Sequence, residues 1–196
     1  MRDFAWNKNK YRDHVMSPID SVKYTKLFLQ AGFMAMDPFT GEVKAWVGGI
    51  DHNYFQYDHV NLNTKRQVGS TINPLLYCYA IDNGFSPCGI VSTAPQDFPT
   101  MKEPYDAGGS EEGDVPMKTA LAKSLNNAAL YILKQVVTDG FLDFAHKCGI
   151  TSRMDPYPSV ALGVSDISLF EMLTAYTMFP TGGMNTTPVV ISKIED

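Results

Sequence analysis

A β-hairpin is the sequence feature that most constrains the fold of this chain. The stretch "AGFMAMDPFTGEVKAWVGG" contains two apolar runs, Phe33–Met36 and Val43–Val47, separated by "DPFTG". Pro38 presets the backbone of a turn and Gly41 can take a positive φ, so the two runs are predicted to pair as antiparallel strands. Both strands are apolar on each face except at Lys44. We therefore expect helices to cover both faces of the sheet.

A helix is predicted to follow the hairpin and the polar loop after it. In "RQVGSTINPLLY" it is expected to begin at Ser70, with Pro74 in its first turn and Leu75 and Leu76 in its apolar face. Gly84 follows as a stop signal.

More helices are predicted downstream. "VPMKTALAKSL" and "NAALYILKQVV" are two helical runs that meet around Ser124 to Asn127, and "FLDFAHKCGI" is a third. Ser168 and Glu171 form a capping box at the start of "SLFEMLTAYTMF", and "PVVISKIED" reads as a further strand. The pattern predicts a polar N-terminal connector followed by helices that pack on a sheet containing the hairpin.

Composition and charge argue against a nucleic-acid partner. The 196 residues are a usual length for one domain, and the 44% apolar content is enough for a sizeable core. The chain has 16 Lys and Arg against 21 Asp and Glu, a net charge of −5, and no long basic run. No apolar run approaches the length of a membrane span, so we expect no membrane segment in this sequence.

The three cysteines define no site. Cys78, Cys88 and Cys148 match neither a paired-CxxC metal site nor a disulfide framework, and an odd number leaves at least one thiol free.

Ser70 is the candidate nucleophile. At a helix start, backbone N–H groups and the positive end of the helix dipole favour an oxyanion developing beside the serine. Position 73 lies one turn away on the same face, where a lysine could act as the base that activates the serine. The residue there is Asn73. Its amide can orient the serine by a hydrogen bond but has no usable basicity.

Four blocks in order resemble the transpeptidase domain of a class A (bifunctional) penicillin-binding protein, whose motifs are Ser-x-x-Lys, Ser-x-Asn and Lys-Thr-Gly. They are "AMDPFTGEVKAWVGG", "KRQVGSTINPLLY", "ALAKSLNNAALYIL" and "VALGVSDISLFEMLTAYTMFPTGG". The resemblance covers residues 30–196, after a connector over residues 1–29. It implies the α+β penicillin-binding-protein/β-lactamase-like fold, in which helices pack on an antiparallel sheet. It also implies that Ser70 is the acylated serine and that Ser124 and Asn126 lie on a loop that faces it. It implies no cofactor and no bound metal.

The sequence departs from the family pattern in two ways. Asn73 stands where the family has its lysine base, and neither Lys-Thr-Gly nor Lys-Ser-Gly occurs in the sequence. In the family the third motif lies on a strand after the block that ends in "GG", so we expect the chain to stop before it. We also expect the glycosyltransferase domain and membrane segment of the family to lie outside the sequence. Such a partial domain is expected to expose a sheet edge and apolar surface.

Each candidate residue also has an ordinary explanation. Serine is a leading N-cap residue, so Ser70 could only cap its helix. Ser124 and Asn126 at a helix junction are common cap and turn residues.

Two other groups contain residue types that occur in metal sites or in hydrolase triads. Asp51-His52 and Asp58-His59 stand seven residues apart, a spacing that fits no common metal-ligand pattern. His14 and His146 have no nucleophile elbow near them, which argues against a hydrolase triad.

Two functions follow from the resemblance and its departures. The first is an acyl-serine D,D-transpeptidase that acts on D-Ala-D-Ala stem peptides of peptidoglycan and is blocked by β-lactams. We expect it to be impaired here by Asn73 and by the missing third motif. The second is a non-catalytic cell-wall binding or interaction domain with the same fold. Asn73 favours the second, unless it is an introduced substitution, whereas Ser70, Ser124 and Asn126 favour the first. The resemblance implies an extracytoplasmic (periplasmic) location for a membrane-anchored parent.

Overall fold

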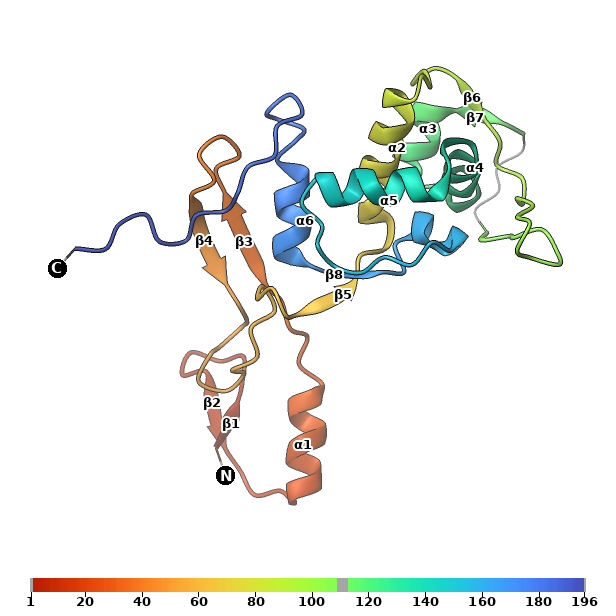
Figure 1. Ribbon diagram of the computed structural model, residues 1–196. Coiled ribbons are helices and arrows are strands. Elements are labelled where there is room, and N and C mark those ends of the chain that lie inside the picture. The colour runs from red at the N-terminus through yellow and green to blue at the C-terminus, as the bar shows by residue number, and fades with distance from the viewer. Residues whose placement is uncertain (1, 109–112, 196) are drawn as a thin grey trace.

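The chain folds into an α+β arrangement in which a hairpin lies beside one helix and a group of helices lies to its side (Figure 1). The computed structural model describes residues 2–108 and 113–195. The predicted fold class is confirmed.

The predicted hairpin is confirmed over both of its strands. β3 (Phe33–Met36) and β4 (Val43–Val47) pair antiparallel. Gly41 in the turn has a φ of 78°, and a Cβ at this position would lie 2.2 Å from the Thr187 carbonyl oxygen. The turn therefore needs glycine both for its backbone conformation and for its close contact with a distant segment.

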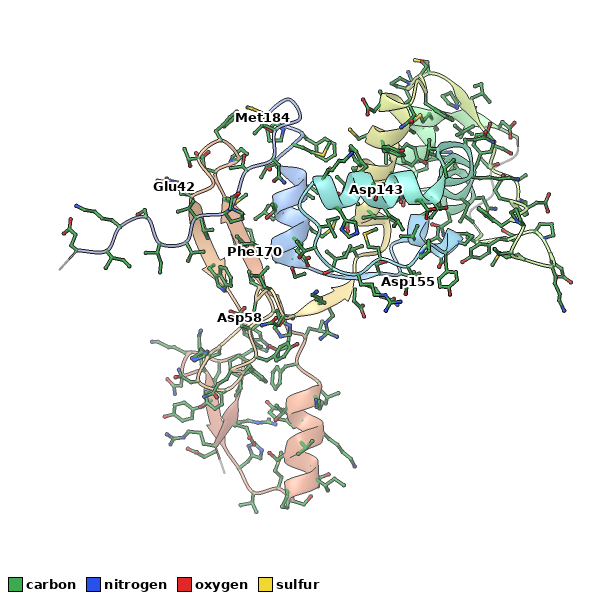
Figure 2. The ribbon with its side chains drawn as sticks, viewed as in Figure 1. Glu42, Asp58, Asp143, Asp155, Phe170 and Met184 are labelled. Carbon is green, nitrogen blue, oxygen red and sulfur yellow. The ribbon has the colours of Figure 1, made fainter. Side chains whose placement is uncertain are left out.

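The prediction that helices cover both faces of the hairpin is wrong. α6 (Leu169–Tyr176) packs against β3, and the ring of Phe170 lies 6.2 Å from the ring of Trp46 (Figure 2). Phe33 is nevertheless 58% exposed and Val47 is 49% exposed. Apolar strand residues therefore remain in contact with solvent.

Helix α2 (Asn73–Asp82) begins three residues later than predicted, after the 3-10 turn η1 (Gly69–Ile72). Pro74 has no N–H and cannot donate an α-helical hydrogen bond to the Ser70 carbonyl. The Asn73 N–H donates to that carbonyl instead. A bond between residues three apart is the 3-10 pattern, so the proline explains why the first turn is not α-helical.

The predicted helical unit contains three more helices. α3 (Met117–Ala122) and α4 (Asn126–Val136) meet at Ser124, as predicted, and α5 (Thr138–Lys147) follows. α2 contacts all three of them (Figure 1). The largest fully buried side chains of this unit include Leu75, Leu76, Met117, Leu130, Leu133 and Phe141.

Short strands link segments that lie far apart in the sequence. β5 (Lys65–Gln67) pairs antiparallel with β8 (Asp166–Ser168), and β6 (Ile90–Val91) pairs with β7 (Val115–Pro116). The 3-10 helix η2 (Pro158–Leu162) precedes β8. None of these elements was predicted from the sequence.

α6 begins where β8 ends. Ser168 caps the helix, and the predicted capping box between Ser168 and Glu171 is confirmed.

The N-terminal residues form a small ordered unit of β1 (Arg2–Phe4), β2 (Tyr11–Asp13) and α1 (Pro18–Lys26). Phe4 is buried, and its ring packs edge-on against the rings of Phe28 and Phe55. This aromatic contact holds the unit against the loop after β4. The domain boundary near residue 29 stays a prediction.

The predicted C-terminal strand is reduced to one parallel bridge between Val189 and Glu42. Val190, Ile191 and Ile194 beyond the bridge are exposed. Among the helices of residues 2–108 and 113–195, none has the length and apolarity needed to cross a lipid bilayer.

Candidate active site

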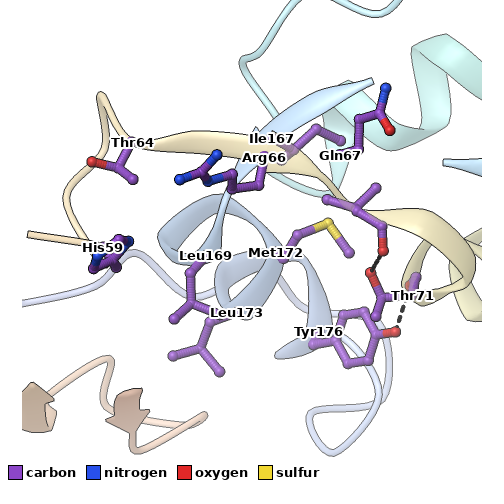
Figure 3. Close-up of a pocket in the computed structure, with 11 residues that line it drawn as sticks. His59, Thr64, Arg66, Gln67, Thr71, Ile167, Leu169, Met172, Leu173 and Tyr176 are labelled. Atoms are coloured by element: carbon purple, nitrogen blue, oxygen red, sulfur yellow. Dashed lines mark hydrogen bonds between the residues drawn. The ribbon is translucent and has the colours of Figure 1, made fainter. Parts of the chain in front are cut away.

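Ser70 lies on a turn that is fixed on both sides. The Gly69 N–H donates to the Gly163 carbonyl over 2.9 Å, and the Tyr176 hydroxyl donates to the Thr71 carbonyl over 2.6 Å (Figure 3). The Ser70 side chain is exposed, and its hydroxyl makes no hydrogen bond within the described residues. A free hydroxyl on a held backbone is the arrangement that a nucleophile requires.

The ordinary explanation of Ser70 as a helix cap is wrong. Ser70 occupies an inner position of η1, and the N-cap residues of η1 and α2 are Val68 and Ile72. Neither cap makes a side-chain hydrogen bond to its helix. The Ser70 hydroxyl therefore has no capping role.

Asn73 lies one turn after Ser70 and faces the protein interior. Its side chain is 2% exposed, and its Oδ1 atom has no hydrogen-bond partner among the described residues. The Tyr77 hydroxyl, one turn further along α2, is also buried without a partner there, and burial raises its pKa. Asn73 thus neither accepts a hydrogen bond from Ser70 nor supplies a base.

Ser124 has a left-handed backbone, with a φ of 53°. Its N–H donates to the Leu121 carbonyl and the Leu125 N–H donates to the Ala120 carbonyl, both over 3.0 Å. These two bonds form the Schellman motif that ends α3, where glycine is the usual residue because a Cβ is strained in this conformation. Strained residues cluster at functional sites, so the geometry supports a role for the exposed Ser124 hydroxyl.

The side chains of Asn126 and Asn127 form hydrogen bonds with the loop at Asp106 and Ala107. Asn126 Nδ2 donates to the Ala107 carbonyl over 3.1 Å, and Asn127 Oδ1 accepts from the Ala107 N–H over 2.9 Å. Asn127 Nδ2 also donates to the Asp106 carboxylate over 3.0 Å, which is the main cause that lowers the pKa of Asp106. Asn127 is fully buried by this loop, whereas Asn126 keeps its Oδ1 free of hydrogen bonds within the described residues.

The candidate residues lie on neighbouring elements. η1 runs directly into α2, and α2 contacts both α3 and α4, whose junction carries Ser124 and Asn126 (Figure 1). Within the described residues, no hydrogen bond joins the side chains of Ser70, Ser124 and Asn126. The roles of Ser70, Asn73, Ser124 and Asn126 stay predictions.

A buried carboxylate fixes the helix that supports the Ser70 turn. Glu171 accepts hydrogen bonds of 2.7–3.0 Å from the N–H and hydroxyl groups of Thr151, Ser152 and Ser168. Burial alone would raise its pKa, but these bonds outweigh burial and lower the pKa to about 2. The charged carboxylate therefore ties the first turn of α6 to the loop after α5.

An apolar cavity of about 390 Å³ lies between the β5–β8 ribbon and α6 (Figure 3). Thr71, Tyr176, Met172 and Leu173 are among the residues that line it. The lining does not include Ser70, so this cavity is beside the turn rather than in front of the candidate nucleophile.

Asp58, which belongs to the second Asp-His pair, forms structural hydrogen bonds. The Asp58 carboxylate accepts hydrogen bonds from the Trp46 indole over 3.0 Å and from the Val60 N–H over 2.8 Å. In residues 2–108 and 113–195, no group of three or more His, Cys, Asp or Glu side chains is placed to hold a metal ion.

The remaining histidines and the cysteines lie away from Ser70 in the hydrogen-bond network. His14 Nε2 lies 3.1 Å from the Asp3 carboxylate, and His146 Nδ1 lies 2.6 Å from the Ile150 carbonyl. The three cysteines are all free thiols.

Sequence reasoning missed Gly163, Tyr176 and Asn127. Gly163 directly follows η2 with a φ of 68°, and a glycine after the Pro-led run "PSVAL" is a signal that could have indicated this helix end. Tyr176 and Thr71 stand 105 residues apart, and no local pattern connects them.

Comparisons with known proteins agree on one family. The family described as "Penicillin binding protein transpeptidase domain" matches residues 31–196. Penicillin-binding protein 2D of Bacillus subtilis (strain 168) is 35% identical over 174 residues, which are 86% of this chain and 25% of that protein.

Solved structures show the same fold. Penicillin-binding protein 1A from Haemophilus influenzae superposes with a TM-score of 0.78 at 23% identity, over 85% of this chain and 26% of that chain. PonA1 from Mycobacterium tuberculosis in complex with penicillin V gives a TM-score of 0.68 at 22% identity, over 87% of this chain and 49% of that chain.

This chain spans about a quarter of the length of the curated relatives it matches. The family match nevertheless covers nearly all of the present sequence and includes the hairpin, the Ser70 turn and the helices around it. The chain belongs to the family of penicillin-binding protein transpeptidase domains.

Proposed function

We propose that this chain carries the acyl-serine site of a peptidoglycan D,D-transpeptidase and that Asn73 impairs its reaction. The observation that carries the proposal is the Ser70 hydroxyl, which is exposed on a turn held at Gly69 and Thr71. Membership of the transpeptidase family supports the reaction class.

In the proposed reaction, Ser70 Oγ attacks the carbonyl carbon of the penultimate D-Ala of a stem peptide. The peptide bond to the terminal D-Ala breaks, D-Ala leaves with the serine proton on its amine, and an ester on Ser70 remains. An amine of a neighbouring stem peptide then attacks the ester, forms the cross-link and returns a proton to Ser70. A β-lactam would open its ring on the same hydroxyl and remain as a stable ester.

The surroundings of Ser70 support this chemistry. The start of η1 and α2 presents the positive end of a helix to the developing oxyanion. The Ser124 hydroxyl and Asn126 Oδ1 make no hydrogen bond within the described residues, so both are available to a bound peptide. We assign these two residues to binding and orienting the stem peptide next to the serine.

Asn73 limits the reaction because an amide cannot take the serine proton. Loss of a positioned general base commonly lowers a rate by about 10² to 10⁴-fold. The Asn73 Oδ1 atom is buried and has no hydrogen-bond partner among the described residues, so the side chain also makes no hydrogen bond that would orient Ser70. Its environment therefore supports Asn73 as a cause of the impairment.

A non-catalytic cell-wall binding or interaction domain is the second candidate function. Asn73 favours it, since a chain without the base could still bind stem peptides. The free hydroxyl of Ser70 and the strained backbone of Ser124 favour the first candidate, because a binding domain needs neither of them.

The proposal includes partners and a location. Stem peptides ending in D-Ala-D-Ala and β-lactams are the proposed ligands. Peptidoglycan lies outside the cytoplasm, so the proposed site works on the extracytoplasmic (periplasmic) face of the membrane, in a parent protein anchored there.

Intact-mass measurement after incubation with a penicillin tests the proposal. The unmodified chain is expected to form little or no adduct. A chain that carries Asn73→Lys and is extended through the third motif is expected to form a stoichiometric adduct at Ser70. Adding Ser70→Ala to Asn73→Lys should abolish the adduct.

Asn63→Lys is the matched control, because it places the same charge on an exposed loop away from Ser70. Rapid stoichiometric labelling of the unmodified chain at Ser70 would contradict the proposed impairment. An extended Asn73→Lys chain that is folded by circular dichroism but not labelled would favour the binding domain.

A further inference from the structure

We propose that Tyr176 is a positioning residue for Ser70 and acts through the Thr71 carbonyl. The inference rests on the proposed function, because Ser70 is the nucleophile only there. The Tyr176 hydroxyl donates to the Thr71 carbonyl over 2.6 Å, and this bond joins α6 to the residue directly after the serine (Figure 3).

Tyr176 holds the turn on the side that follows Ser70, in addition to the continuation of the chain into α2. The β5–β8 pairing and the bond from Gly69 to Gly163 both fix the chain before Ser70. Within the described residues, the Tyr176 bond is the one from a separate element to the carbonyl that follows Ser70. Ser70 therefore has a bond to a separate element on each side, and loss of the second would leave the residues after it held only through the continuation into α2.

The Thr71 side chain links the first and last parts of the turn to each other. Its hydroxyl donates to the Val68 carbonyl over 2.6 Å, which closes the turn around Ser70 (Figure 3). A tie at the Thr71 carbonyl therefore restrains Val68, Ser70 and Thr71 together.

Tyr176 is itself well placed to act as a tie. Its ring packs edge-on against the ring of Phe179, with centroids 5.4 Å apart, and the Glu171 carboxylate fixes the first turn of the same helix. Burial raises the pKa of Tyr176, so the hydroxyl keeps its proton and remains a donor at neutral pH.

The test compares Tyr176→Phe with Tyr131→Phe. Both variants remove one hydroxyl from a half-buried tyrosine, but the Tyr131 hydroxyl makes no hydrogen bond within the described residues. Native-state amide hydrogen exchange is measured for both in the unmodified chain. Tyr176→Phe is expected to speed exchange of the Thr71 and Asn73 amides about fivefold, the size of one lost hydrogen bond, with α4 and α5 unchanged.

A second measurement separates positioning from a purely structural role. In the Asn73→Lys chain extended through the third motif, the acylation rate constant and the dissociation constant for a penicillin are determined separately. Tyr176→Phe should lower the rate constant about fivefold and leave the dissociation constant unchanged, and Tyr131→Phe should change neither.

The outcomes distinguish this inference from the proposed function. If the extended Asn73→Lys chain is never acylated, the proposed function fails, while the exchange experiment in the unmodified chain still tests the hydrogen bond from Tyr176. The restraint by Tyr176 is overturned if Tyr176→Phe leaves the exchange rates of the Thr71 and Asn73 amides unchanged. It is also overturned if exchange becomes faster to the same extent over α4 and α5. Faster local exchange with an unchanged acylation rate constant overturns the positioning role.

Discussion

The Gly69 N–H donates to the Gly163 carbonyl over 2.9 Å, and a Cβ at Gly163 would lie 2.0 Å from the Gly69 carbonyl oxygen. Both glycines have a positive φ. The two backbones touch directly beside Ser70, so any side chain at position 163 would displace the turn.

Gly163→Ala is expected to lower the free energy of unfolding by about 2–3 kcal/mol, because it adds a steric clash to backbone strain. Gly182→Ala is the control, since Gly182 has a φ of 71° but nothing within 4 Å of its built Cβ. The control should lose about 1 kcal/mol. Urea denaturation measures both losses, and equal losses would show that the contact with Gly69 is unimportant.

Ser124→Gly is expected to raise the free energy of unfolding by about 0.5–1 kcal/mol. Glycine adopts the left-handed conformation of this Schellman position without the strain of a Cβ. Ser124→Ala removes the same hydroxyl but keeps the Cβ, so it should not be stabilised. Thermal denaturation of both variants gives the comparison, and a stabilised alanine variant would refute the strain argument.

Glu171 is expected to make stability depend on pH in the acidic range. Its pKa is about 2 in the folded protein against 4.5 as the ordinary value, so the unfolded state binds a proton first as the pH falls. The stabilisation, about 3 kcal/mol, is complete above the unfolded pKa and is lost as the pH falls from about 4.5 to 2. The free energy of unfolding measured across this range should fall more steeply for the unmodified chain than for Glu171→Gln. Parallel curves would contradict the assignment.

Tyr77→Phe is expected to leave stability unchanged or to raise it by about 1 kcal/mol, because the buried hydroxyl it removes has no partner among the described residues. Tyr24→Phe is the matched control. Its hydroxyl donates to the Phe4 carbonyl over 2.9 Å, and its loss should lower the free energy of unfolding by about 1 kcal/mol. Chemical denaturation of the two variants should therefore give effects of different sign or size.

The elements predicted correctly are those whose signals are local. The turn of the hairpin and the capping box of Ser168 and Glu171 each lie within a few residues, and the structure contains both. The predicted start of α2 is three residues too early, because Pro74 removes the donor that an α-helical first turn needs.

The rest of the candidate site could not be predicted because it depends on tertiary contacts. The bond from Tyr176 to Thr71 and the pairing of β5 with β8 join segments about a hundred residues apart, and neither leaves a periodic trace in the sequence. The burial of the Asn73 side chain could also not be predicted from the sequence, since an asparagine near a helix start is usually exposed.

The 3-10 geometry of η1 has a consequence for position 73. Side chains three residues apart are eclipsed along a 3-10 turn, whereas an α-helix would rotate them apart by about 60°. Ser70 and Asn73 therefore stand in line, one at the solvent end of the turn and one at its inner end. Because Pro74 has no N–H to donate, the turn thus aligns the side chains of residues 70 and 73 along its axis.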